Sequence, residues 1–183
     1  MRGYFGIGVE GISKPMNVGN LLRSAHSFGA SFFFTVSPTV DVRGMRDSDT
    51  SDAFGHLPFY SFEKPADLIL PMKTSLVAIE FLSDAIDLPS FRHPQQAVYV
   101  LGPEMGNVSD EMLARCDYTL KIPMKFCVNV GVAGALVMYD RLISLGKFAD
   151  RPVHEGGPAG MSHVANKDSF APQQLKEDQI VCK

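Results

Sequence analysis

Three short stretches of this chain, far apart in the sequence, hold the residues with the clearest chemical potential. Each one joins the end of an apolar, strand-like run to a glycine-rich turn or to a helix of small residues. Open α/β sheets bind ligands just beyond the carboxyl ends of their strands, so the stretches predict one ligand site built from three turns. They are NVGNLLRSA at residues 17–25, LGPEMG at 101–106, and IPM at 122–124 followed by NVGVA at 129–133.

Arg23 is the first candidate for chemistry. Its planar guanidinium can hold a phosphate and a neighbouring hydroxyl at the same time. The plainer alternative is a surface arginine whose stem covers apolar surface. Because guanidinium rarely gives up its proton, we expect Arg23 to orient a hydroxyl and stabilise developing charge rather than to act as a literal base. Asn17, at the start of the same predicted helix, suits an N-cap.

The second stretch places Glu104 between Gly102 and Gly106 directly after an apolar run. Glycines let backbone amides approach a ligand closely, although a simple strand-to-helix turn would need only one. Glu104 could bond a ribose hydroxyl or neighbouring amides. Neither G-x-G-x-x-G nor a P-loop is present, so a dinucleotide or ATP site is unsupported and a Rossmann-type small-molecule enzyme is disfavoured.

The elements that must position these turns follow from apolar periodicity. Alternating strands and helices predict an α/β fold with a mainly parallel sheet of five to six strands and helices on both faces. We expect one domain over residues 1–150 and a disordered or loosely docked tail over 151–183. Strands are expected at 4–9, 30–36, 75–81, 97–101 and 118–122, helices at 17–28, 62–70, 109–114 and 129–145, and a long polar loop at 37–58.

Composition excludes several classes. With 45% apolar and 20% charged residues the chain is typical of a globular protein. No signal peptide is visible, and no apolar run approaches the roughly 20 residues that span a bilayer, so we expect no membrane partner. The three cysteines are odd in number and lack metal-ligand spacing, which predicts reduced thiols in a cytoplasmic protein and no metal site.

Charge is distributed unevenly. The net charge of −3 argues mildly against an indiscriminate nucleic-acid binder. Residues 1–46, however, hold five basic against two acidic side chains, whereas residues 47–96 hold three against eight. Folding could therefore assemble a local basic surface.

In order and spacing, the three stretches resemble the three motifs of the SpoU (TrmH-type) branch of the SPOUT RNA methyltransferase superfamily, over about residues 4–146. The resemblance implies an α/β-knot with a C-terminal trefoil knot and a C2 homodimer. It implies S-adenosyl-L-methionine as cofactor and ribose 2′-hydroxyls of tRNA or rRNA as substrate. No accessory RNA-binding domain precedes the core, which favours tRNA slightly.

The resemblance also implies roles for individual residues. The catalytic set would be Arg23, Asn17, Glu104 and Asn129, with Asn129 capping the last helix. Arg23, Arg43 and Arg46 are expected to contact RNA. The cofactor would be bound by Ile79, Leu101, Gly102, Glu104, Gly106, Ile122, Met124, Cys127 and Val128.

Three positions depart from the relatives' pattern. Cys127 stands where many have Ser or Thr, Val128 stands where many have Leu, and Asp52 replaces a common Gly. The departures at Cys127 and Asp52 and the acidic net charge favour an alternative, a non-catalytic RNA-binding SPOUT homodimer that retains the fold. The presence of Arg23, Glu104 and Asn129 opposes it.

Overall fold

The computed structural model describes residues 3–47, 52–153 and 155. Contacts between residues divide the chain into one unit at Met1–Gly146 and a second at Lys147–Lys183. All described helices and strands lie in the first unit, and the described part of the second unit is irregular. The predicted tail over 151–183 falls mostly outside the described residues, so that boundary stays a prediction.

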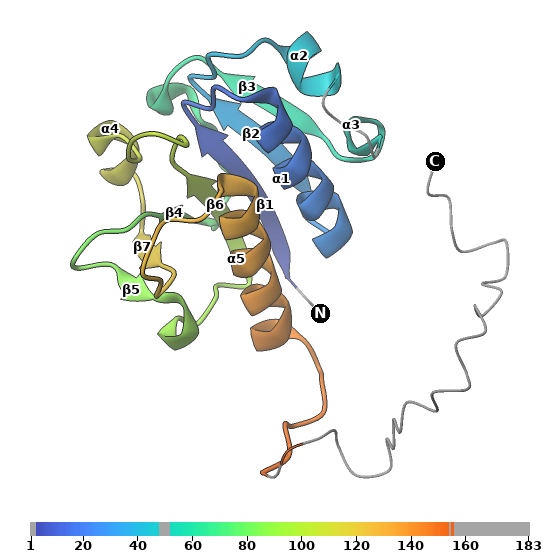
Figure 1. Ribbon diagram of the computed structural model, residues 1–183, viewed down its shortest axis with the longest axis vertical. Coiled ribbons are helices and arrows are strands. Elements are labelled where there is room, and N and C mark those ends of the chain that lie inside the picture. Colours follow the sequence, from blue (N-terminus) through green and yellow to red (C-terminus); the bar gives the residue numbers. More distant parts are fainter. Residues whose placement is uncertain (1–2, 48–51, 154, 156–183) are drawn as a thin grey trace, which may run out of the picture. The chain divides into compact units, whose positions relative to one another are not determined.

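The first unit is built on a parallel sheet of seven strands in the order β3-β2-β1-β6-β4-β7-β5 (Figure 1). The α/β class and the parallel sheet are confirmed, whereas the expected five to six strands were too few. The knot stays a prediction. The strands are β1 Tyr4–Glu10, β2 Phe32–Val36, β3 Phe59–Phe62, β4 Ser75–Ile79, β5 Ile86–Asp87, β6 Gln96–Leu101 and β7 Tyr118–Lys121.

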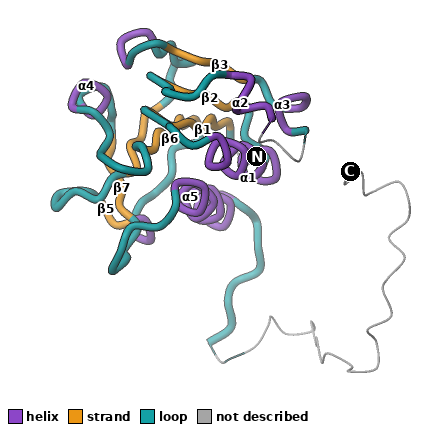
Figure 2. The backbone as a smooth tube through the Cα atoms, turned by 45° about the horizontal axis from the view of Figure 1, so that its top comes forward, coloured by secondary structure: helices purple, strands orange, loops and turns teal. Residues whose placement is uncertain are grey.

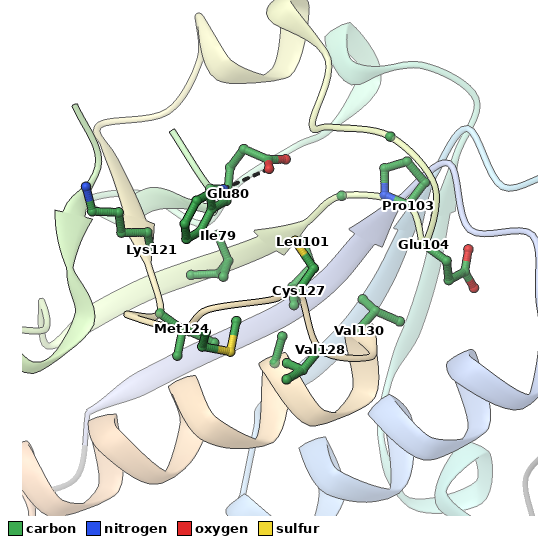
Figure 3. A pocket seen from close by; sticks show the side chains of 15 residues that line it. Ile79, Glu80, Leu101, Pro103, Glu104, Lys121, Met124, Cys127, Val128 and Val130 are labelled. Atoms are coloured by element: carbon green, nitrogen blue, oxygen red, sulfur yellow. Dashed lines mark hydrogen bonds between the residues drawn. The ribbon is translucent and has the colours of Figure 1, made fainter. Parts of the chain in front are cut away.

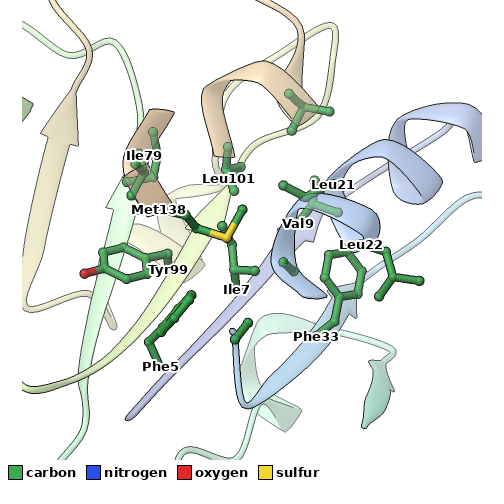
Figure 4. Close-up of a cluster of buried hydrophobic side chains, with 14 of the residues drawn as sticks. Phe5, Ile7, Val9, Leu21, Leu22, Phe33, Ile79, Tyr99, Leu101 and Met138 are labelled. Carbon is green, nitrogen blue, oxygen red and sulfur yellow. The ribbon is translucent and has the colours of Figure 1, made fainter. Parts of the chain in front are cut away.

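The central strands are near-continuous apolar runs because both faces of the sheet are covered. On one face lie α1 (Pro15–Phe28) and α5 (Val130–Leu145), which pack against each other (Figures 1 and 2). Their inward side chains join those of the sheet in the larger core (Figure 4). On the other face a second core lies under α4 (Asp110–Leu113) and the 3-10 turn η1 (Pro65–Asp67).

Small residues allow α1 and α5 to approach closely. A Cβ added to Gly134 would lie 2.2 Å from Leu21 Cδ1, and one added to Gly131 would lie 3.1 Å from Asn20 Cβ. The small-residue stripe of α5 is therefore packed against α1 of the same chain. The side chains of α5 that remain exposed are larger and include Val132, Leu136 and Tyr139.

The sequence predicted the N-cap of α5 correctly but not the N-cap of α1. Asn129 is the N-cap of α5, and its side chain accepts a hydrogen bond from Gly131 N, as expected. The prediction that Asn17 caps α1 was wrong. Pro15 occupies the first turn and Lys14 is the N-cap, because proline tolerates the N-terminal position of a helix, where its missing N–H costs nothing.

Residues 37–70 also differ from the prediction. The expected loop contains α2 (Val42–Asp47) and α3 (Ala53–His56), both too short to show helical periodicity. The helix expected at 62–70 is wrong. Its first residue, Phe62, ends β3, which pairs with β2, and Pro65 then starts η1. The short η2 (Leu88–Ser90) follows β5.

Candidate functional site

A cleft of about 140 Å³ lies at the carboxyl ends of β4, β6 and β7 and beside the first turn of α5 (Figure 3). It contains all nine residues that the sequence predicted as cofactor contacts. Two of the three motif stretches therefore meet here, as expected for parallel sheets. The lining residues are Ile79, Glu80, Phe81, Leu101, Gly102, Pro103, Glu104, Gly106, Lys121, Ile122, Met124, Cys127, Val128, Val130 and Ala133.

The first stretch reaches this cleft through hydrogen bonds rather than as part of its lining. Asn17, buried in α1, donates from Nδ2 to Glu104 Oε1 at 2.6 Å. Its Oδ1 accepts from Asn129 Nδ2 at 2.8 Å, while Asn129 Oδ1 accepts from Gly131 N at 2.8 Å. One chain of side chains thus links all three stretches.

Glu104 is turned toward α1 and away from the centre of the cleft (Figure 3). Its Oε2 accepts hydrogen bonds from the hydroxyl and the backbone amide of Ser13, at 3.2 and 3.4 Å. Burial alone would raise the pKa of Glu104, but the hydrogen bonds from Asn17 and Ser13 outweigh it and lower the pKa below its ordinary value. Glu104 is therefore a charged acceptor that fixes the loop, not a proton donor.

Two further carboxylates, which the sequence reasoning missed, hold the same loop. Glu80 Oε2 accepts from Val108 N at 2.7 Å, and Glu10 accepts from the amide and hydroxyl of Ser109 at 2.9 and 2.6 Å. A Cβ on Gly102 would lie 2.9 Å from Val108 N, so only glycine lets the loop fold back this tightly. The sequence signal for Glu10 and Glu80 was the position of an acidic residue at the end of a strand or directly after it.

Arg23 does not line the cleft. It is exposed on α1 and lies in a separate groove of about 460 Å³ between α1 and α5, together with Asn20, Asn129 and Tyr139. Asn129 lies where the groove meets the cleft, because its neighbours Val128 and Val130 line the cleft. Among the described residues Arg23 has no hydrogen-bond or ion-pair partner, which leaves its guanidinium available to a ligand.

The other predicted RNA contacts lie on α2, outside the lining of the cleft. Arg43 and Arg46 are exposed, and the Arg46 guanidinium carbon lies 5.7 Å from the centroid of the Phe54 ring. Asp52, just before α3, has φ of 53°. This left-handed conformation favours glycine but is tolerated by aspartate, so the departure at this position does not prevent the turn.

The model of the SpoU rRNA Methylase family matches residues 5–139. The chain belongs to this family. The match runs from β1 into α5 and so contains the cleft, the groove and the hydrogen-bond chain that joins them. The motif resemblance read from the sequence is confirmed.

Relatives of this SpoU-family chain carry names that state an activity. The chain is 27% identical over 139 residues to the mouse protein named tRNA (guanosine(18)-2'-O)-methyltransferase TARBP1. The alignment covers 70% of this chain and 9% of the relative. The chain is 25% identical over 138 residues to the tRNA (guanosine(18)-2'-O)-methyltransferase of Escherichia coli K12, covering 72% and 60%. The chain thus spans only part of the length of these relatives.

Solved structures show the same fold. The SpoU methyltransferase AviRb from Streptomyces viridochromogenes matches with a TM-score of 0.70 and 23% identity, over 78% of this chain and 60% of AviRb. In the described part of this SpoU-family chain, no helix has the length and apolarity to cross a membrane. Within the same ranges, no group of three or more His, Cys, Asp and Glu could hold a metal ion.

Proposed function

We propose that this chain is an S-adenosyl-L-methionine-dependent RNA methyltransferase that acts on a ribose 2′-hydroxyl, in tRNA in preference to rRNA. The observation that carries the proposal is the cleft itself. All nine predicted cofactor residues line it, and Asn17 ties it to the helix that bears Arg23. The names of the mouse and Escherichia coli relatives support the choice of tRNA and of the 2′-oxygen.

The residues present fit the cofactor. Apolar side chains such as Ile79, Leu101 and Ile122 offer walls for a flat adenine. Gly102 and Gly106 expose backbone groups to the cleft, and Glu80 adds a carboxylate on its wall, which suits a ligand that carries a sulfonium cation. When bound, this cofactor supplies an activated methyl group.

The chain's own residues then position and polarise the reactants. Glu104, Asn17 and Asn129 fix the loop and the start of α5 against each other. Arg23, with its free guanidinium, orients the ribose hydroxyl and an adjacent phosphate and stabilises the charge that develops on the oxygen. Arg23 lies in the groove, which adjoins the cleft at Asn129.

We also propose that the exposed face of α1 and α5 forms the C2 homodimer. Val132, Leu136 and Tyr139 present apolar surface there beside Arg23, and self-complementary apolar faces are typical of such dimers. A cytoplasmic location accords with the free thiols of Cys116 and Cys127.

The test is methyl transfer from labelled S-adenosyl-L-methionine to total RNA, followed by mapping of alkali-resistant 2′-O-methyl sites. Label at discrete positions in tRNA supports the proposal. Label only on bases, or none with RNA from any source, contradicts it.

A non-catalytic RNA-binding dimer is the second candidate, favoured by the separation of Arg23 from the cleft. Calorimetric titration with S-adenosyl-L-methionine separates the two, since a site that has lost its function should bind no cofactor.

A further inference from the structure

Glutamate carboxylates gather at the loop of residues 102–109, which forms one wall of the cleft. Glu80 follows β4 directly and lines the cleft itself (Figure 3). Its Oε1 accepts from Phe81 N at 2.8 Å and its Oε2 from Val108 N at 2.7 Å. A Cβ added to Gly102 would lie 3.2 Å from Glu80 Oε2, so this carboxylate is held against the backbone at the end of β6.

Glu104 and Glu10 add negative charge at the same loop. The Glu104 oxygens accept from Asn17 and Ser13. Glu10, which is buried, accepts from the amide and the hydroxyl of Ser109. These amide and hydroxyl donors are neutral, so they fix the orientation of each carboxylate while its charge remains. The wall that the loop contributes to the cleft is therefore acidic, and a cleft lined by one sign of charge concentrates ligands of the other sign.

The positive charge at the cleft is smaller. Of the described residues that line it, Lys121 is the basic one, and its ammonium group donates to the carbonyls of Leu82 and Ser83 at 3.5 and 3.2 Å. The first turn of α5 adds the positive end of a helix dipole, equivalent to roughly half a charge. Lys125 and Asp87, which line the adjoining hollow, carry charges of opposite sign. A lysine and a helix end thus oppose the carboxylates of Glu10, Glu80 and Glu104.

The methyl donor and its product differ in charge at one atom. Transfer moves the methyl carbon from sulfur to the ribose oxygen, the sulfur keeps the electron pair of the broken bond, and the hydroxyl proton passes to water. S-adenosyl-L-methionine therefore carries a sulfonium cation where S-adenosylhomocysteine carries a neutral thioether, and their other charged groups are the same. In a cleft of about 140 Å³, the sulfur lies within roughly one Debye length of Glu80, about 8 Å at physiological ionic strength.

We propose that Glu80 makes the cleft selective for the sulfonium form, so that the methyl donor binds more tightly than the spent cofactor. This selectivity rests on the proposed function, because it concerns the cofactor of that reaction. Loss of the positive charge on transfer removes the attraction to the acidic wall and favours release of S-adenosylhomocysteine. Glu80 acts on the charge of the ligand and not on the ribose hydroxyl, so it determines specificity and takes no part in the transfer itself.

The test is calorimetric titration of the full chain with S-adenosyl-L-methionine, S-adenosylhomocysteine and sinefungin, which carries a protonated amino group where the sulfonium carries its methyl. Both cations should bind the wild type about fivefold or more tightly than the thioether. Glu80→Gln should reduce this preference by about threefold or more, whereas Glu80→Asp, which keeps the charge, should retain it. Lys121→Gln removes positive charge from the lining and should increase the preference, a change of opposite sign that does not depend on the folding of Glu80→Gln.

Glu63→Gln is the matched control. It removes the same charge at an exposed position directly after β3, which is separated from β4 by β2, β1 and β6. The preference for the two cations should be unchanged in this variant.

Equal affinity of the wild type for the three ligands would overturn the proposal. So would a Glu80→Gln variant that weakens all three equally or keeps the full preference, because Glu80 would then only support the loop. These outcomes, with S-adenosyl-L-methionine still bound, leave the proposed function standing. Charge-selective binding without methyl transfer to RNA from any source refutes the proposed function alone, and binding of none of the three ligands contradicts both.

Discussion

Asn17 Oδ1 accepts a hydrogen bond from Asn129 Nδ2 at 2.8 Å, across 112 positions of sequence. The contact joins the first turn of α1 to the N-cap of α5. On its other side Asn17 donates to Glu104, so a single buried amide holds three separate segments in register. Removing it should therefore affect the fold and the cleft together.

Asn17→Ala should lower the free energy of unfolding by about 1–3 kcal/mol, because it removes the hydrogen bonds that Asn17 makes with Glu104 Oε1 and Asn129 Nδ2. Asn17→Asp should cost more, since it places a second carboxylate 2.6 Å from Glu104. Urea denaturation measures both effects. Asn20→Ala, an exposed position one turn along α1, is the matched control and should be near neutral. Equal stability of Asn17→Ala and Asn20→Ala would show that the amide bridge contributes nothing.

Arg23→Ala should abolish methyl transfer while cofactor affinity stays within a few-fold of wild type, because Arg23 is exposed and lies outside the lining of the cleft. Arg23→Lys should restore little, since an ammonium group cannot reproduce the planar fork of guanidinium. Single-turnover transfer and calorimetry give the two quantities. Arg92→Ala, at another exposed arginine, is the control. Full activity in Arg23→Ala removes this residue from the mechanism.

The position of the cleft at the ends of strands could be predicted from the sequence for a physical reason, whereas its individual cofactor residues were implied by the motif resemblance. Strands buried on both faces need unbroken apolar runs, so the ends of β4, β6 and β7 and the turns after them were visible. The N-cap role of Asn129 was implied by the motif resemblance, and the structure confirms it. Features that depend on residues adjacent in sequence, such as these strand ends and turns, could therefore be predicted.

The remainder depended on partners distant in sequence. The partners of Asn17 lie 87 and 112 positions away, so its local spacing suggested a cap that Lys14 in fact provides. The short edge strands β3 and β5 exist because they pair with β2 and β7. The placement of Arg23 in a groove beside the cleft follows from how α1 packs on α5, which no helical periodicity encodes.

Acidification should destabilise the fold through His93, a buried residue that contacts Asp140 in the C-terminal half of α5. His93 Nδ1 lies 2.6 Å from the Tyr99 hydroxyl and Nε2 lies 2.9 Å from Asp140 Oδ2. Burial lowers the pKa of His93 below its ordinary value of 6.5, and the hydrogen bond to Asp140 only partly offsets this effect. The folded state therefore keeps His93 neutral where the unfolded chain already binds a proton.

The pKa of His93 is lower in the folded state than in the unfolded chain. The contribution of neutral His93 to stability is therefore complete above pH 6.5 and is lost as the pH falls below that value. We expect the free energy of unfolding to decrease there by at most about 1.4 kcal/mol per pH unit from this group. His93→Gln should flatten the profile. The contribution of Glu104 is lost separately, below its ordinary pKa of 4.5. An identical slope in wild type and His93→Gln would exclude His93 as the cause.

Alkylation of Cys127 should report occupancy of the cleft directly. This thiol is exposed and lines the cleft, whereas burial, followed by the charge of Asp117, raises the pKa of Cys116 to about 12, which suppresses its thiolate. In a Cys182→Ser background, which removes a thiol outside the described residues, a maleimide should label Cys127 first. S-adenosylhomocysteine at about ten times its Kd should slow that labelling about tenfold, as followed by intact-protein mass spectrometry.

Cys127→Ser, which should take up no rapid label, identifies the reacting thiol. Labelling of Cys127 at an unchanged rate, under conditions where calorimetry shows saturation, would place the ligand away from this cleft.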